Sequence, residues 1–300
     1  MSQYRRILLI ADPAMKRTPA FERAVWLART CGAALHIALF DRNSVIKGAA
    51  LIDRDAAVEA RRIWMLEREH WLRVETATLQ AGGVVVTSEV VWARPVAEDI
   101  LNVAADQQAD LVVKDVHLEG VLQRVLLTPL DWQLLRQCAV PLMLVNSLGH
   151  ALPRRIVAAV DASHDYKAGD LNDRVIQEAL RLAIPCDAEL HLIHAFSGPQ
   201  QLIDPNGAGV GSIGELERIL LPVHQRNFAA IADAHSVPAD RRHFLRGTPV
   251  RVISDFARQR HSDVIVIGSV RHNFIDRLIM GTTAEALLDQ APCNLLAVKP

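Results

Sequence analysis

The stretch RRILLIAD at residues 5–12 decides the fold, because a close copy of it, RRIVAAVD, stands at residues 154–161. Further matched pairs follow in the same order and at a nearly constant offset: CGAALH at 31–36 with CDAELH at 186–191, DLVV at 110–113 with DVIV at 263–266, and LV at 144–145 with AV at 297–298. Ordered matches of this kind indicate one unit that was duplicated. Each half is long enough for its own hydrophobic core, so two domains are expected and not a solenoid of short repeats.

Short apolar runs alternate with helical segments in each half. In the second half, strands are expected at about 156–161, 189–195, 241–246, 263–268 and 294–298, and helices at about 171–183, 214–235, 249–260 and 283–290. The first half follows the same order, with a charged helix from about Ala56 to Ala81. Runs that are apolar at nearly every position suit a parallel sheet covered on both faces. The fold class is therefore α/β, with two tandem Rossmann-like domains at residues 1–147 and 153–300, each a five-stranded parallel sheet with helices on both faces.

The bulk composition excludes several classes of protein. Of the 300 residues, 50% are hydrophobic and 22% are charged, which excludes a disordered chain. The formal net charge of −1 provides no general attraction for nucleic acid or for an anionic membrane surface. No apolar run approaches the roughly 20 residues of a membrane helix, and the run that begins at Ile7 is too short for a signal peptide. The four cysteines form no CxxC pair, so neither a zinc ribbon nor a disulfide framework is indicated. From these features we expect a cytoplasmic protein.

The topology predicts where a ligand binds before any motif is considered. In open parallel sheets, ligands bind beyond the carboxyl ends of the strands, where the strand order reverses. In the second half, that rule selects the loops after Asp161, after Ala195 and after Gly268.

A glycine and hydroxyl pattern follows the strand that ends at Gly268. Gly281, Thr282 and Glu285 read as a glycine before a capping box that opens the last helix. A helix N-terminus preceded by glycine offers N–H donors and the positive end of the helix dipole, which suits a phosphate group. Local physics leaves a second interpretation open, in which these residues only start a helix.

The same segment resembles the nucleotide-binding signature of the universal stress protein family: Gly, two residues, Gly, nine residues, Gly, then Ser or Thr. Gly268, Gly281 and Thr282 match the first glycine, the last glycine and the hydroxyl position. The family's first-strand Asp-x-Ser is matched by Asp161 and Ser163, and its Gly-x-Pro by residues 247–249. The run TPLDWQLLRQC at 128–138 is similar to the first domain of the tandem E group of this family.

The resemblance implies an adenine nucleotide alpha hydrolase-like fold and a stress-response function, with ATP as the candidate ligand of the second domain. The implied contacts are Asp161, Ser163, Ala195, Gly268, Ser269, Arg271, Gly281, Thr282 and Thr283. The resemblance implies no catalytic residue and no metal-binding residue. The only metal ion expected is the magnesium that accompanies the nucleotide.

One departure from the signature leaves the ligand open. Arg271 stands where the family has its second glycine. The guanidinium group either blocks the pocket, leaving a ligand-free interaction protein, or pairs with a phosphate. A slow ATP hydrolase is a further alternative, with Asp161 as the neighbour of the metal.

The first half departs further from the signature. Asp115 stands at the position of Gly268, Leu118 at that of Arg271 and Thr128 at that of Gly281. Pro129 lacks an N–H group, and the carboxylates of Asp115 and Asp131 would repel an anion, an effect that Lys114 offsets only in part. The sequence predicts a poor phosphate site in the first domain.

Two other patterns are interpreted as structural. The GVGSIG run at 209–214 follows no strand directly, so we predict a loop and not a dinucleotide fingerprint. His191 and His194 are three apart on a strand, so they point to opposite faces of the sheet and share no metal.

The last strand of each half is short and apolar and is expected at a sheet edge. An edge strand has unpaired backbone groups that must be covered. We predict that residues 142–145 and 295–298 pair antiparallel within one chain, giving an intramolecular pseudo-dimer, while a homodimer through other faces stays open.

Overall fold

The computed structural model describes residues 3–43, 52–94, 96–116, 130–146, 152–198, 213–269 and 292–300, together with Ile46 and Gly48. The chain divides into two compact units, Ser2–Ser147 and Leu148–Pro300. The predicted last helix at 283–290, the glycine-rich run at 209–212 and Thr128 and Pro129 lie outside the described residues.

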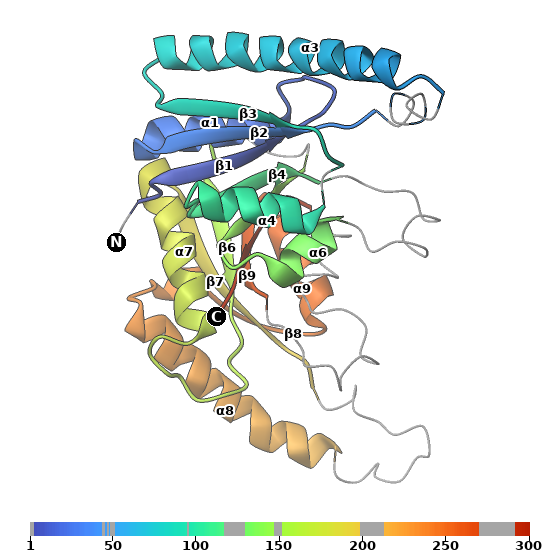
Figure 1. Cartoon of the computed structure of the whole chain (residues 1–300). Helices are drawn as coiled ribbons and strands as arrows, with labels where there is room; N and C mark the ends of the chain where they lie inside the picture. The colour runs from blue at the N-terminus through green and yellow to red at the C-terminus, as the bar shows by residue number, and fades with distance from the viewer. Residues whose placement is uncertain are drawn as a thin grey trace. The chain divides into compact units, whose positions relative to one another are not determined.

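The first unit is a five-stranded parallel sheet in the order β3-β2-β1-β4-β5. Its elements are β1 (Arg6–Ala11), α1 (Pro19–Cys31), β2 (Ala34–Phe40), α3 (Arg54–Ala81), β3 (Val86–Val91), α4 (Ala97–Asp106), β4 (Leu111–Asp115), α6 (Leu130–Gln137) and β5 (Leu142–Val145). Helices α1 and α3 share one face, where the rings of Phe21 and Trp71 meet. Helices α4 and α6 contact each other on the opposite face (Figure 1).

The second unit repeats this topology, with the order β10-β9-β6-β7-β8 and parallel pairing throughout. Its elements are β6 (Arg155–Ala159), α7 (Leu171–Cys186), β7 (Glu189–Phe196), α8 (Ile213–Ala234), the 3-10 turn η2 (Ala239–Arg241), β8 (Arg242–Arg246), α9 (Pro249–Gln259), β9 (Val264–Gly268) and β10 (Asn294–Val298). Helices α7 and α8 cover one face of this sheet, and α9 covers the other (Figure 1). The predicted α/β class and the two parallel sheets are confirmed.

The pairing register is the same in the two units. Ile7 of β1 lies opposite Leu35 and Leu111, and Ile156 of β6 lies opposite Leu190 and Val264. These are the repeat-equivalent positions. The duplicated sequence therefore specifies a duplicated sheet, down to the residue pairs.

The Arg-Arg and Asp residues of the repeat have a structural reason. The carboxylate of Asp110 accepts the backbone N–H groups of Arg5 (2.9 Å) and Arg6 (3.1 Å), and that of Asp263 accepts those of residues 154 (2.7 Å) and 155 (3.0 Å). Each carboxylate satisfies backbone donors at the start of a central strand. The same hydrogen bonds in both units explain why these residues recur.

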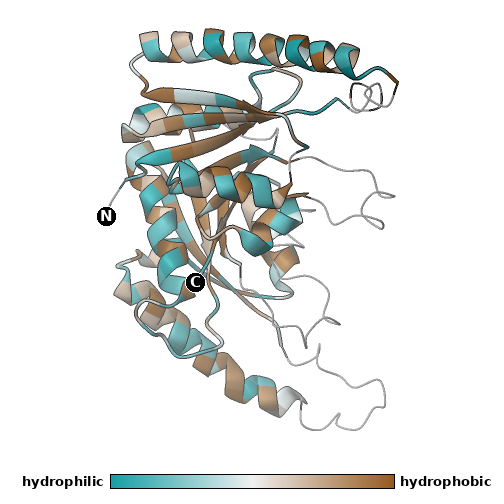
Figure 2. Ribbon diagram, viewed as in Figure 1, coloured by the Kyte–Doolittle hydropathy of each residue, from teal (hydrophilic) through white to brown (hydrophobic). Residues whose placement is uncertain are grey.

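Burial of the central strands explains their composition. In β1, β4, β6 and β9, every residue except one at an end is buried, so apolar side chains are required on both faces of the sheet. Figure 2 shows these strands as largely hydrophobic, whereas the covering helices carry hydrophilic and hydrophobic residues in turn. The long helix α3 is the extreme case, since its buried residues are only Ala57, Arg68, Leu72 and Leu79.

The helices begin and end where the sequence supplies caps. The hydroxyl of Thr18 accepts the N–H of Phe21, Pro19 occupies the first turn of α1, and Gly32 ends that helix at a φ of 64°. The carboxylate of Asp170 accepts the N–H of Asp173 and opens α7. None of the helices in the described residues is long and apolar enough to span a membrane.

Candidate functional site

A pocket of about 510 Å³ opens at the carboxyl ends of β6, β7 and β9, the edge that the topology predicts for a ligand. Its polar lining residues are Asp161, Ser163, Asn172, His194, Ser197 and His224. Its apolar and glycine lining comes from Ala159, Val160, Leu171, Val175, Ala195, Pro249, Ile253, Ile267 and Gly268. Four of the nine predicted contacts, Asp161, Ser163, Ala195 and Gly268, are thus brought together.

Asp161 is held by a side chain that the sequence analysis did not select. The amide group of Asn172 accepts the N–H of Asp161 (2.9 Å) and donates to its C=O (2.7 Å). Because both backbone groups of Asp161 are taken by a side chain, β6 ends at Ala159 and not at residue 161, where the sequence pattern had placed its end. The Asp161 carboxylate accepts the N–H of Ser163 (2.9 Å), as that of Asp12 accepts the N–H of Ala14 in the first unit (2.7 Å).

Gly268 has a packing role at the end of β9. A Cβ atom at this position would lie 2.5 Å from Cδ2 of Leu171, so no larger residue fits unless Leu171 moves. Leu171 lines the pocket and is the first residue of α7. The glycine therefore brings α7 close to the strand end, whether or not a ligand approaches the backbone.

Ser269 lies beside the pocket and is buried. Its N–H donates to the carbonyl of Val298 (2.8 Å), and its hydroxyl accepts from Nζ of Lys299 (3.0 Å). This contact places a cationic side chain from the end of β10 next to the strand end at Gly268. The remaining predicted contacts, Arg271, Gly281, Thr282 and Thr283, lie outside the described residues.

Two histidines of the pocket touch each other. His194 projects from β7 toward α8, and its Nε2 lies 3.1 Å from Nδ1 of His224. Burial lowers the pKa of each imidazole below its ordinary value. The sequence predicts His194 as a satisfied sheet histidine and indicates no role for His224, because residues from a strand and a helix 30 positions apart show no spacing signal.

The carboxylates at the equivalent edge of the first unit are engaged by one ion pair and by hydrogen bonds within the unit. Nζ of Lys114 lies 2.7 Å from Oδ1 of Asp131, and both side chains are 4% exposed. The carboxylate of Asp115 accepts the hydroxyl of Thr18 and the N–H of Ala20 (3.0 Å), at the N-terminus of α1. Internal carboxylates therefore occupy donors that an anionic ligand would need.

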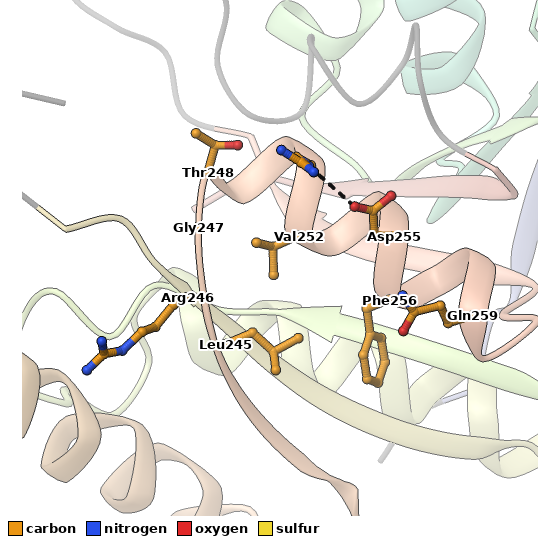
Figure 3. Close-up of a pocket in the computed structure, with 9 residues that line it drawn as sticks. Leu245, Arg246, Gly247, Thr248, Val252, Asp255, Phe256 and Gln259 are labelled. Carbon is orange, nitrogen blue, oxygen red and sulfur yellow. Dashed lines mark ion pairs between the residues drawn. The ribbon is translucent and has the colours of Figure 1, made fainter. Parts of the chain in front are cut away.

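A second hollow of the second unit, of about 550 Å³, is lined by the end of β8, the residues that follow it and one side of α9 (Figure 3). Leu245, Val252 and Phe256 line it, and Arg251 and Asp255 form an ion pair at 3.6 Å. Gly247 has a φ of 135°, and a Cβ there would lie 2.7 Å from Cγ2 of Val252. The glycine of the Gly-x-Pro motif is therefore required by the chain path between β8 and α9.

The opposite face of β7 carries a second histidine pair, in which Nδ1 of His191 lies 3.0 Å from Nε2 of His243. As predicted, His191 and His194 point to opposite faces: His191 packs on Phe256 of α9, and His194 on His224 and Phe228 of α8. Among the described residues, no group of three His, Cys, Asp or Glu side chains is placed to bind a metal ion.

The His191–His243 pair predicts a pH dependence of stability. Burial, and then the nearby His191 and Arg260, lower the pKa of His243 to about 4, against about 6.5 in an unfolded chain. Above pH ~6.5 the imidazole of His243 is neutral in the folded and in the unfolded protein. As the pH falls toward ~4, the imidazole binds a proton in the unfolded protein but stays neutral in the folded one. The second unit should therefore lose stability over this range.

Thermal unfolding of the chain, followed by circular dichroism of both units, measures this loss as a difference between the parent and a variant at His243. The variant His243→Phe keeps the ring volume and should show a smaller fall in its unfolding midpoint between pH ~7 and ~5. Equal falls in the variant and the parent would show that His243 does not carry the effect.

Comparison with known proteins identifies the family. The sequence profile of the Universal stress protein family matches residues 3–146 and again residues 153–299. Universal stress protein E of Salmonella typhi is 27% identical over 309 residues, covering 100% of this chain and 96% of the relative. The Universal stress protein E homolog of Haemophilus influenzae is 25% identical, covering 99% of this chain and 98% of the relative.

Solved structures show the same fold. The putative universal stress protein of Pseudomonas aeruginosa UCBPP-PA14 aligns with a TM-score of 0.72 at 22% identity, covering 99% of this chain and 94% of that one. A universal stress protein of Archaeoglobus fulgidus aligns with a TM-score of 0.63 at 15% identity, covering 98% and 96%. With one match of the family profile in each repeat and full-length relatives, this chain belongs to the universal stress protein family as a tandem, E-like member.

Proposed function

We propose that this protein is a cytoplasmic, non-catalytic stress-response module that binds one adenine nucleotide, ATP, in its second unit. The observation that carries the proposal is the gathering of Asp161, Ser163, Ala195 and Gly268 at one pocket of about 510 Å³. Asp161, Ser163 and Gly268 match motif positions of the family, and all four residues lie at the sheet edge where doubly wound folds bind ligands.

Cationic groups near this edge would offset the carboxylate of Asp161, which lines the pocket. Lys299 reaches the residue next to Gly268, at 3.0 Å from the hydroxyl of Ser269. Gly281 and Thr282 match the phosphate-binding positions of the signature, and Arg271 supplies a guanidinium group that pairs with phosphate in this proposal. Magnesium then enters only as the companion of the nucleotide.

The first unit is proposed not to bind nucleotide. Its Lys114 is paired with Asp131, and its Asp115 carboxylate lies at the N-terminus of α1. A phosphate group there would meet two carboxylates of the protein, at a cost of several kcal/mol for like charges in contact.

Calorimetric titration of the whole chain with ATP and Mg²⁺ tests the proposal. We expect saturable binding with a stoichiometry of one nucleotide per chain. Absence of heat and of any ATP-dependent rise in the unfolding temperature would indicate a pocket blocked by Arg271, and a stoichiometry of two would contradict the role given to the first unit. Steady release of phosphate from the complex would show that the protein is a slow ATP hydrolase and not a non-catalytic binding module.

The proposal includes an intramolecular pseudo-dimer, formed by antiparallel pairing of β5 with β10. In the strand order of its own unit, each of these strands is terminal: β5 pairs with β4, and β10 with β9. Terminal strands of apolar composition are stabilised when another strand covers their free backbone groups.

Lysine at Leu144 and Leu296 together tests this pairing. We expect a lower sedimentation coefficient, as the units separate. Because both leucines are buried, circular dichroism is needed to check that each unit is still folded. A double variant that sediments as the parent does would show that the two strands do not pair. Self-association of the parent in the same experiment would reveal a homodimer instead.

A further inference from the structure

The pocket of the second unit contains a proton-accepting pair that no motif of the sequence describes. His224 of α8 and His194 of β7 both line the pocket, with their ring centroids 5.3 Å apart. Of the two, His194 is 4% exposed. His224 is partly exposed, so His224 is the member that solvent and a ligand reach.

The buried ring of His194 faces two backbone groups of the loop that follows β6. Its Nδ1 lies 3.0 Å from the carbonyl of Val160 and 3.2 Å from the N–H of Ala162. One nitrogen cannot donate and accept at once. A protonated Nδ1 donates to Val160, whereas an unprotonated Nδ1 accepts from Ala162.

The protonation of Nδ1 of His194 determines the direction of the hydrogen bond between the two imidazole rings. When Nδ1 of a neutral His194 carries the proton, its Nε2 is an acceptor, so Nδ1 of His224 must donate. When Nδ1 carries no proton, Nε2 of His194 donates, and Nδ1 of His224 must accept. The neutral pair therefore has two arrangements, and each uses a different backbone group of the loop beside Asp161.

Protonation of His224 leaves only one of these two arrangements. A protonated His224 has N–H on both nitrogens, so its Nδ1 can only donate to Nε2 of His194. His194 then carries its own proton on Nδ1 and donates to the carbonyl of Val160. The N–H of Ala162 loses its acceptor, and the pocket gains a positive charge.

The surroundings keep the pair neutral near neutral pH. Burial is the largest cause that lowers the pKa of both imidazoles. The titratable groups that act on His224 are Asp161 and His164 of the loop after β6, the first opposing and the second adding to the lowering, and His194 itself. The ring of Phe196 contacts His224 from β7, and those of Phe228 and Phe244 pack on His194 from α8 and β8, so these elements present apolar groups here.

We propose that His224 is a ligand-recognition residue and His194 its positioning residue, and that uptake of one proton by His224 makes the pocket bind an anionic ligand more tightly while it resets the loop beside Asp161. This inference rests on the proposed nucleotide pocket for its ligand, but the coupling between His224 and the loop stands without a ligand. A nucleotide or another phosphate ester is the class of ligand that gains from the added charge.

The chain supplies a matched control on the other face of the same strand. His191 and His243 also meet at 3.0 Å, and His243 also has a lowered pKa, yet neither residue lines this pocket. His243→Gln therefore removes a half-buried titrating ring of β8 without touching the His194–His224 pair, while His224→Gln breaks that pair and keeps a polar side chain.

The first test needs no ligand. The amide ¹H–¹⁵N signal of Ala162 is followed by NMR between pH ~5 and ~8, together with the ring signals of His224. We expect the Ala162 amide to titrate with the pKa of His224 in the parent and in His243→Gln, and to lose this titration in His224→Gln. An Ala162 signal that titrates unchanged in His224→Gln, or does not follow His224, overturns the coupling.

The second test measures ATP affinity in the same variants at pH ~7.5 and ~5.5. The phosphate groups of ATP titrate equally in every variant, so the ratio of the dissociation constants of His224→Gln and the parent isolates the protein group. We expect this ratio to rise about tenfold at the lower pH, the effect of a shift of about one unit in the pKa of His224 on binding, and to stay flat for His243→Gln. If ATP binds but the ratio for His224→Gln is the same at both pH values, His224 does not recognise the ligand. If ATP does not bind at either pH, the nucleotide pocket is refuted, and the NMR result alone tests the coupling between His224 and the loop.

Discussion

The first unit is expected to lose about 3–5 kcal/mol of its free energy of unfolding when Lys114 is replaced by methionine, because the buried carboxylate of Asp131 then loses its ion pair with Nζ of Lys114. Both side chains of this ion pair are 4% exposed, at an N–O distance of 2.7 Å, so water cannot replace the lost partner. Lowering the pH should reduce the loss, since Asp131 can then take a proton.

The tryptophans allow this effect to be measured in one unit alone. All five, Trp26, Trp64, Trp71, Trp92 and Trp132, belong to the first unit. Urea unfolding followed by tryptophan fluorescence therefore reports on this unit, and circular dichroism reports on both.

The double variant Lys114→Met with Asp131→Leu is the matched control. Removing both charges restores an apolar contact of similar volume, so most of the lost stability should return. A single variant as stable as the parent would mean that the pair is hydrated and does not fill the first unit's ligand edge.

ATP binding is expected to weaken by about a hundredfold or more when Gly281 is replaced by aspartate, because a carboxylate would then stand where the signature places a phosphate. The repeat offers a control with the same change of charge. Thr128 stands at the equivalent position of the first unit, and Thr128→Asp should leave ATP affinity unchanged.

Equilibrium titration of both variants with ATP and Mg²⁺ measures this contrast. Unchanged ATP affinity in Gly281→Asp would show that the phosphate groups bind elsewhere. A loss of ATP affinity in Thr128→Asp would show that the first unit takes part in binding. Circular dichroism checks that each variant remains folded.

The fold could be predicted from the sequence because the information was repeated. Arg5, Arg6 and Asp110 recur as a set, and the structure explains the set by hydrogen bonds at the start of each central strand. Continuous apolar runs left few alternatives to a buried parallel sheet. Strand ends were less predictable, since β6 ends early at a contact with Asn172, eleven residues further along the chain.

The site was predictable only where a motif or the topology selected it. Asp161, Ser163, Ala195 and Gly268 were expected at the pocket and line it. Asn172 and His224 were missed because their roles depend on distances in space, between a helix and a strand end, that leave no spacing in the sequence. The packing of Gly268 on Leu171 was missed for the same reason, since a glycine before a loop indicates freedom of the backbone and not which side chain fills the space.

The first unit shows the same limit. Asp115 and Asp131 were expected to repel an anion, and both carboxylates are engaged internally. That Lys114 is buried and paired with Asp131, and that Asp115 caps α1 with Thr18, could not be inferred from the order of residues alone.

A crystal structure of the whole chain grown with ATP and Mg²⁺ would show whether the second unit binds the nucleotide. We expect density for one nucleotide per chain, bounded by Asp161, Ala195 and Gly268 of the second unit, and an intact ion pair of Lys114 with Asp131 in the first unit. Density for a nucleotide in the first unit, or a second-unit pocket filled by the side chain of Arg271 at saturating ATP, would contradict this expectation.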